Sequence, residues 1–202
     1  AKSTTGEGST PLHLAAMRGK LGVCKALIQN LLSQKAKDSD IAAYVNSVDK
    51  DGMTPLHRAT HRGQKDVVLW LVATMKAKVD IEDRDGCTPL HNACEVGSLT
   101  SVTHLLSHGA QVSKKDKDGW TPFHVACATG FEDVVQVLMT QTNPAVFLSK
   151  TRSDHSTGLH FAAARGHAEV CRVLLQHKQV TPAVQLSTKD KWGHTPVDIA
   201  TS

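Results

Sequence analysis

The chain has 202 residues, of which 40% are hydrophobic and 21% charged, and this composition excludes a disordered tail. Aromatic residues make up only 4%, so Ala, Leu and Val must fill the core. The net charge is +4, and the sequence contains no block of five like charges. No apolar run nears the ~20 residues of a membrane span, and no signal peptide opens the chain.

A hexapeptide with the pattern Thr-Pro-Leu-His-x-Ala recurs along the chain. Its copies start 44, 34, 33, 36 and 38 residues apart, and the last two are looser than the first four. Each copy predicts the start of a short helix, because the Thr hydroxyl can cap a helix and Pro fits its first position. The copies begin at Thr10, Thr54, Thr88, Thr121, Thr157 and Thr195.

The second copy shows the layout expected of one unit. Thr54 begins a first helix that Gly63 ends, and residues 65–72 form a second helix. Residues 167–175 repeat that second helix with an apolar stripe at three- and four-residue spacing. Asp-x-x-Gly segments between the units predict tight turns, because Gly accepts a positive φ. These turns are residues 49–52, 83–86, 116–119 and 190–193.

Some units depart from this layout. The first interval carries extra residues around 33–44. Asn143-Pro and Thr181-Pro predict an added helical turn in the fourth and fifth units, with Asn143 and Thr181 as caps. Gly158 replaces the proline of the fifth hexapeptide, which predicts a less firmly started helix. The sixth unit stops without a second helix, so the array is truncated there or ends in a half repeat.

The hexapeptide and the period near 33 residues resemble the ankyrin repeat. The resemblance covers almost the whole chain and implies an all-α solenoid of stacked helix-turn-helix units with short β-hairpin-like fingers. We expect residues 1–202 to form a single array. Its repeats are expected at approximately 5–48, 49–82, 83–115, 116–151 and 152–189, with a partial repeat at 190–202.

The sequence contains twelve histidines, a residue type that often takes part in catalysis or binds metal ions. The resemblance implies instead that the hexapeptide histidines hydrogen-bond within their turn and to the adjoining finger. His104 and His108 could present two nitrogens to zinc from one helix face, but no third ligand is evident. We therefore expect no metal and no cofactor. No phosphate loop, acid/base carboxylate pair or catalytic triad has a meaningful spacing, so we expect no enzyme.

The five cysteines are odd in number and form no Cys-x-x-Cys motif. They indicate free thiols in a reducing compartment, the cytoplasm or the nucleus. Cys24, Cys94, Cys127 and Cys171 fit small buried positions, whereas Cys87 precedes a hexapeptide on a finger. Thiol chemistry at Cys87 is therefore an alternative activity.

The resemblance implies a protein–protein interaction module whose concave surface is lined by finger tips and by the ends of the first helices. We expect a monomer that binds another protein, with no specific nucleic-acid partner and no membrane insertion. Trp120, Met53 and Arg62 are the hypothetical centre, although Trp120 could instead pack against the adjacent finger. The candidate partner-binding residues are Met53, His61, Arg62, Arg84, Cys87, Glu95, Trp120, Thr129, Arg165 and Trp192.

Two other functions fit the sequence. The chain can be the targeting or regulatory segment of a larger multidomain enzyme or channel, which the missing initial Met and the abrupt end favour. It can also be a proteasome-assembly chaperone of the gankyrin type, because those are arrays of similar length with one degenerate late repeat.

Overall fold

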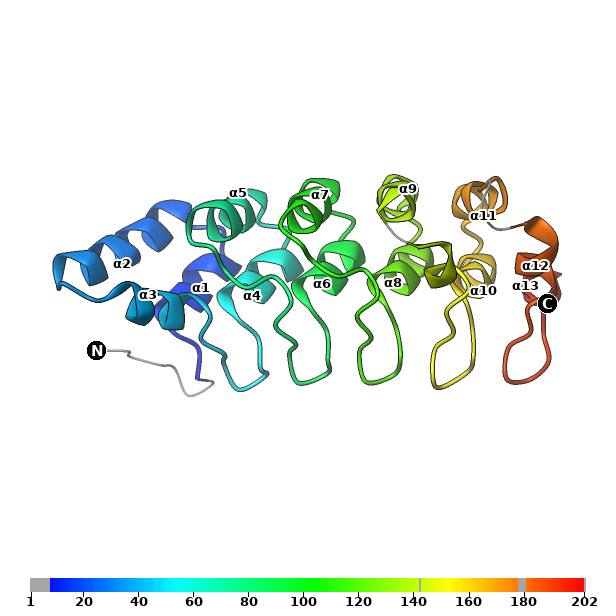
Figure 1. Ribbon diagram of the computed structural model, residues 1–202, viewed down its shortest axis with the longest axis horizontal. Coiled ribbons are helices and arrows are strands. Elements are labelled where there is room, and N and C mark those ends of the chain that lie inside the picture. Colours follow the sequence, from blue (N-terminus) through cyan, green and yellow to red (C-terminus); the bar gives the residue numbers. More distant parts are fainter. Residues whose placement is uncertain (1–7, 142, 178–180, 202) are drawn as a thin grey trace. The chain divides into compact units, whose positions relative to one another are not determined.

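The computed structural model describes residues 8–141, 143–177 and 181–201 (Figure 1). Over these residues the regular secondary structure is helical throughout, and no strand is formed. The all-α expectation is therefore confirmed. The chain divides into two compact units, residues 1–111 (unit 1) and 112–202 (unit 2), and each is described by itself.

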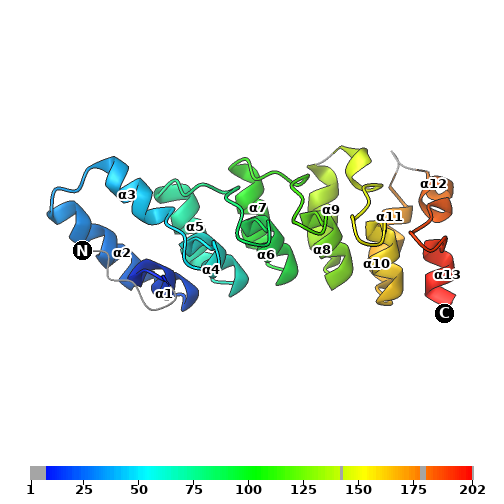
Figure 2. The same ribbon diagram turned by 90° about the horizontal axis from the view of Figure 1, so that it is seen from below.

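Unit 1 consists of two rows of helices. The first helices α1, α4 and α6 pack side by side, and α2, α5 and α7 form the second row (Figure 2). The bounds are α1 (Pro11–Met17), α2 (Leu21–Ser33), α3 (Asp38–Val45), α4 (Pro55–His61), α5 (Lys65–Leu69), α6 (Pro89–Glu95) and α7 (Leu99–Ser107). A π-helical turn, η1 (Trp70–Thr74), continues α5, so the expected α-helix over 65–72 changes type at Trp70.

Unit 2 repeats the two rows. The helices α8, α10 and α13 pack in order, and α9 packs on α11 behind them. The bounds are α8 (Pro122–Thr129), α9 (Glu132–Thr140), α10 (Gly158–Ala164), α11 (Ala168–Leu175), α12 (Pro182–Ser187) and α13 (Pro196–Thr201), with a 3₁₀ turn η2 (Pro144–Val146). No helix in the described part of the chain has both the length and the apolar character that crossing a membrane requires.

The hexapeptides start their helices as predicted. In α4 the Thr54 Oγ1 accepts the His57 N–H at 3.3 Å, and the His57 Nδ1 accepts the Thr54 N–H at 3.1 Å. Each helix start leaves N–H groups without helical partners, and this reciprocal pair satisfies two of them. In α13 Asp198 takes the place of the histidine, and its Oδ2 accepts the Thr195 N–H at 2.8 Å.

Stacking joins the small apolar surfaces of the repeats into a core within each unit. The hexapeptide leucines Leu12, Leu56 and Leu90 are buried in unit 1, and Phe123 and Leu159 are buried in unit 2. A single helix pair has too little apolar surface to fold alone, so each repeat depends on its neighbours.

The lengthened intervals add helices, as expected for the fourth and fifth units. The extra residues of the first interval form α3, which buries Ile41 and Tyr44. The Asn143 Oδ1 accepts the Ala145 N–H at 2.9 Å and so caps η2 as predicted. Thr181 is the N-cap residue of α12 as predicted, but its hydroxyl makes no capping hydrogen bond.

The start of α10 does not show the weaker geometry expected from Gly158. Thr157 and His160 make the same reciprocal hydrogen bonds as the other hexapeptides. A Cβ at Gly158 would lie only 2.8 Å from the Cys127 Sγ and 3.0 Å from the Phe123 ring. Glycine therefore stands at a close contact between α10 and α8. The expected repeat boundaries stay predictions.

Candidate functional site

A chain reversal precedes each of the first helices α4, α6, α8, α10 and α13, and we call these reversals fingers. Four of them begin with an aspartate whose backbone N–H donates to the carbonyl of the residue four positions later in the chain. The Asp83 N–H, for example, donates to the Cys87 carbonyl at 2.9 Å. Thr151 leads the remaining finger and donates to Ser156 at 3.1 Å. The fingers are residues 49–53 and 83–87 in unit 1, and 116–120, 151–156 and 190–194 in unit 2.

The leading aspartate also fixes the finger through its side chain. The Asp190 Oδ1 accepts the N–H groups of Trp192 at 2.9 Å and His194 at 2.8 Å. Burial alone would raise the pKa of Asp190, but these hydrogen bonds outweigh it and lower the pKa. Gly193 then turns the chain at φ +88°, where a side chain would be strained.

Hydrogen bonds join the tips of neighbouring fingers within each unit. In unit 1 the Arg84 N–H donates to the Asp51 carbonyl at 2.9 Å. In unit 2 the Arg152 N–H donates to the Asp118 carbonyl at 2.8 Å, and the Lys191 N–H to the Asp154 carbonyl at 2.7 Å. The side chains at these positions are therefore presented on a backbone that is already fixed.

Hexapeptide histidines connect the first helices to the fingers, as expected. The Nε2 of His13 lies 3.0 Å from the Met53 carbonyl, and that of His57 lies 3.2 Å from the Cys87 carbonyl. Because a carbonyl only accepts, Nε2 carries the proton and Nδ1 is the acceptor. Burial lowers the pKa of His13, His57 and His160 despite these hydrogen bonds, and so favours the neutral ring.

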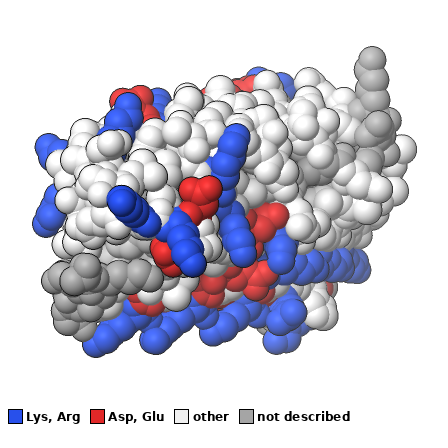
Figure 3. All heavy atoms as spheres, turned by 60° about the vertical axis from the view of Figure 1, so that its left-hand side comes forward, with Lys and Arg blue, Asp and Glu red and all other residues white. Residues whose placement is uncertain are grey.

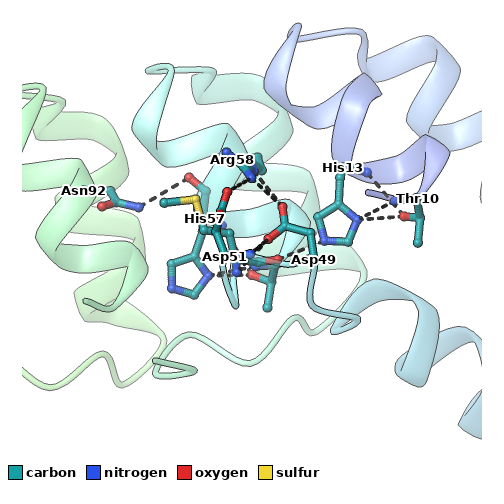
Figure 4. A network of polar contacts seen from close by, with 9 residues as sticks. Thr10, His13, Asp49, Asp51, His57, Arg58 and Asn92 are labelled. Carbon is teal, nitrogen blue, oxygen red and sulfur yellow. Dashed lines mark hydrogen bonds and ion pairs between the residues drawn. The ribbon is translucent and has the colours of Figure 1, made fainter. Parts of the chain in front are cut away.

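The finger surface of unit 1 carries charged side chains that form ion pairs with one another (Figure 4). The Arg58 Nε donates to the Asp49 Oδ2 at 2.8 Å, and its Nη2 donates to the Asp51 Oδ2 at 2.7 Å. The Asp49 side chain is fully buried, so Arg58 compensates a charge that water does not reach. The His61 Nδ1 lies 3.7 Å from the Glu95 Oε2 on the next first helix.

The finger surface of unit 2 is aromatic. The Trp120 ring stacks on the Phe161 ring with their centroids 4.1 Å apart, and it meets the His124 ring edge-on at 6.3 Å. Trp120 is half-buried by this packing, whereas Trp192 is 65% exposed at its finger. Trp120 therefore packs sideways, here on the first helix of the following repeat.

The predicted binding residues divide between the units. In unit 1 Arg62, Arg84 and Glu95 are exposed, while Met53, His61 and Cys87 are half-buried. In unit 2 Arg165 is exposed and its Nη1 donates to the Ala128 carbonyl at 3.0 Å. The Thr129 hydroxyl donates to the Val125 carbonyl at 2.9 Å, so it is engaged within its own helix. That these residues contact a partner, with Trp120, Met53 and Arg62 at the centre, stays a prediction.

The cysteines are free thiols, and most are protected by burial. Burial raises the pKa of Cys24 to about 11 and also raises that of Cys94 and Cys171, so these thiols stay protonated at neutral pH. Cys171 is half-buried rather than fully buried as predicted. Cys87 is half-buried, and thiol chemistry there stays a prediction.

The ring centroids of His104 in α7 and of His108, the residue that follows α7, lie 4.5 Å apart. Within the part of the chain that the structure describes, no group of three or more His, Cys, Asp or Glu could hold a metal ion. Two neighbouring imidazoles are too few ligands for a closed zinc site, which needs four.

Sequence reasoning missed Arg58, Asp49 and Phe161. Arg58 and Phe161 both occupy the variable fifth position of the hexapeptide, and each contacts a residue of a finger. That position is the signal that could have found them, because it varies between constant neighbours. The role of Asp49 was hidden because the turn signal explained it equally well.

Comparison with known families agrees with this architecture. A family model described as ankyrin repeats (3 copies) matches residues 1–84 and 73–147, and one described as ankyrin repeats (many copies) matches residues 148–200. The chain belongs to the ankyrin-repeat family. Ankyrin repeats are non-enzymatic modules that bind protein partners, so the solenoid architecture and the interaction role expected from the hexapeptides are confirmed at this level.

Two relatives match only a small part of the chain. The liver-isoform mitochondrial glutaminase of Rattus norvegicus is 41% identical over 56 residues, 28% of this chain and 9% of the relative. The corresponding glutaminase of Mus musculus is 47% identical over 47 residues, 23% of this chain and 7% of the relative. The matched segment therefore spans less than a tenth of these relatives.

Proposed function

We propose that this ankyrin-repeat chain is a non-catalytic binding module that holds a polypeptide partner on its finger surfaces. The observation that carries the proposal is Trp192, a large apolar side chain that is 65% exposed at a finger whose backbone is fixed by hydrogen bonds. Exposed tryptophan beside charged residues is the usual composition of an interface hot spot. A fixed backbone also reduces the conformational entropy lost on binding.

Site-specific photo-crosslinking tests this proposal. A photoreactive amino acid replaces Trp192 in one variant and Gln136, exposed on α9 of the second row, in another. Cell extract is added to each variant, and we expect polypeptide cross-links from position 192 but few from position 136. Cross-links that form equally from both positions, or only from position 136, would contradict the proposal.

The same module could serve inside a larger enzyme or channel. The local likeness to the two glutaminases is consistent with that alternative but does not favour it, because ankyrin segments accompany many activities. The full-length reading frame decides between them. A proteasome-assembly chaperone of the gankyrin type is a third possibility, for which co-purification with proteasome subunits is the test.

We further propose that the protein is a monomer in a reducing compartment, the cytoplasm or the nucleus. The five free cysteines support a reducing compartment, because oxidising compartments favour disulfides. Imaging of a fluorescent fusion tests the location. Light scattering of the purified chain tests the monomeric state, and a molecular mass twice that of the chain would refute it.

A further inference from the structure

The fingers of the two units carry opposite net charge. Each finger is counted together with the three residues that precede it. In unit 1, residues 46–53 and 80–87 contain six acidic and two basic side chains. In unit 2, residues 113–120, 148–156 and 187–194 contain four acidic and seven basic side chains. In Figure 3 charged side chains of both signs gather in the lower part of the face that it draws.

The acidic side chains of the unit 2 fingers are turned inward. Asp190 is buried and Asp154 is half-buried, and their Oδ1 atoms accept N–H groups of their own fingers. The Asp154 carboxylate also accepts the Thr151 hydroxyl. Asp118 is the exposed acidic residue of these fingers. Three of the four carboxylates, those of Asp116, Asp154 and Asp190, therefore already accept hydrogen bonds within the protein.

The basic side chains of these fingers are turned outward. Lys150, Arg152 and Lys191 are exposed, and they donate to backbone carbonyls of other residues. The Arg152 Nη1 lies 3.3 Å from the Lys117 carbonyl, and the Lys191 Nζ lies 3.3 Å from the Ser153 carbonyl. Because a carbonyl carries only a partial charge, the positive charges remain available to a carboxylate. We call Lys117, Lys150, Arg152, Lys189 and Lys191 the basic finger row.

The basic finger row is interleaved with the aromatic side chains of the same unit. Trp120 follows Lys117 in one finger, and Trp192 follows Lys191 in the last finger. The Arg152 and Lys191 backbone N–H groups bond each finger to its predecessor, so the tips are neighbours. A segment lying along these tips would meet positive charges and apolar rings together.

We propose that the finger surface of unit 2 binds an acidic polypeptide segment whose apolar side chains pack on Trp192 and on the Trp120–Phe161 pair. This inference rests on the proposed function and assigns the partner's chemistry. Charge complementarity selects the acidic segment, since like charges brought together across an interface cost several kcal/mol. A nucleic acid fits less well, because the unit 2 fingers have an excess of only three positive charges and expose the Asp118 carboxylate, whereas a nucleic acid carries a phosphate at every nucleotide.

Titration calorimetry with the whole 202-residue chain tests the inference. The first probe is a short peptide in which glutamates alternate with phenylalanines, the second replaces every glutamate with lysine, and the third is a thymidine oligonucleotide. We expect the glutamate peptide to bind, with an affinity that falls as sodium chloride is added. The lysine peptide and the oligonucleotide should bind at least about tenfold more weakly.

Charge-reversed variants locate the binding. Arg152→Glu combined with Lys191→Glu should lower the affinity for the glutamate peptide by about tenfold or more. Trp192→Ala should lower that affinity by a similar factor. The matched control combines Lys25→Glu with Lys65→Glu, which applies the same charge change to exposed second-row positions of unit 1. We expect this control to bind as the unaltered chain does. Circular dichroism confirms that all variants are folded.

Several outcomes would overturn the inference. These are tighter binding of the lysine peptide or the oligonucleotide, no binding of the glutamate peptide, and equal weakening by the control. The photo-crosslinking experiment remains independent of this one. Cross-links at position 192 to a polypeptide together with failure of the glutamate peptide would leave the proposed function standing and refute only the acidic chemistry of the partner.

Discussion

The two units use one backbone design to present different chemistry. One of the variable fifth positions of the unit 1 hexapeptides is Arg58, which is bonded to Asp49 and Asp51. One of those in unit 2 is Phe161, which stacks on Trp120. The threonine–histidine pairs and the finger hydrogen bonds recur in both, except that in unit 2 Thr151 leads one finger and Asp198 replaces the histidine of α13. The comparison shows that the repeat fixes where side chains project and leaves their chemistry to a few positions.

Acidification should have the largest effect, because it acts on a feature that both units share. His13 and His57 in unit 1 and His160 in unit 2 have lowered pKa values in the folded chain, so the unfolded chain binds more protons below its own histidine pKa, about 6.5. Stability is therefore fully present above about pH 6.5 and falls as the pH is lowered towards the folded pKa values.

Urea denaturation at a series of pH values measures this loss. Trp70 lies in unit 1, and Trp120 and Trp192 lie in unit 2. The fluorescence of a variant that keeps only Trp70 therefore reports the unfolding of unit 1, and that of a variant that keeps only the other two tryptophans reports the unfolding of unit 2. His57→Gln should give a shallower pH dependence in unit 1 alone. An unchanged slope in that variant would show that the buried imidazole does not cause the acid sensitivity.

A larger side chain at Gly158, in the core of unit 2, should have the next largest effect on stability. Gly158→Leu places a side chain against the Cys127 Sγ and the Phe123 ring, where even a Cβ is too close. We expect a loss of about 3 kcal/mol in the free energy of unfolding, because an overpacked core distorts its neighbours. Gly22→Ala in unit 1 is the matched control, since a Cβ there has nothing within 4 Å and alanine favours the helix. Comparable destabilisation by both would refute the close approach of α10 to α8.

Removal of Arg58 should destabilise unit 1 by about 2 kcal/mol, because Arg58→Ala leaves the Asp49 carboxylate buried without its cation. The counterpart in unit 2 is Arg152→Ala, which removes an exposed side chain bonded to a carbonyl and should change stability by less than about 0.5 kcal/mol. Chemical denaturation followed by circular dichroism measures both. Equal losses would show that the two finger surfaces do not differ in internal pairing.

The smallest expected difference is between the stability losses caused by replacing Trp120 and by replacing Trp192. Trp120→Ala loses a stacked, half-buried ring and should cost about 1 kcal/mol, whereas Trp192→Ala should be within about 0.5 kcal/mol of the unaltered chain. Acrylamide should quench the fluorescence of Trp192 more strongly than that of Trp120. The reverse order of quenching would contradict the exposure that the proposed binding surface requires.

The helices could be predicted from the sequence because their causes are local. A capping threonine and a proline mark where a helix begins, and the period of the hexapeptide places the next one. The 3.0 Å hydrogen bond between His13 and Met53 spans 40 residues, yet the family resemblance predicted its kind. Thr181 shows the limit, because it is the N-cap residue of α12 although its hydroxyl makes no hydrogen bond to the helix.

The candidate site was less predictable, because its character depends on which side chains become neighbours. Nothing local distinguishes Arg58 from Phe161 as residues of one register, and only the folded chain shows that one meets two aspartates and the other a tryptophan. The sequence likewise contains the excess of lysine and arginine in the later fingers. Which carboxylates turn inward is decided by the N–H groups of each finger.

The fifth hexapeptide position takes no part in the threonine–histidine hydrogen bonds that start each first helix. A substitution there changes the side chain next to a finger without removing the hydrogen bonds that start the helix, and its cost is small where the original side chain is not paired as Arg58 is. Selection for a new partner can thus act on one repeat at a time. An array built this way changes its binding specificity through separate substitutions in separate repeats.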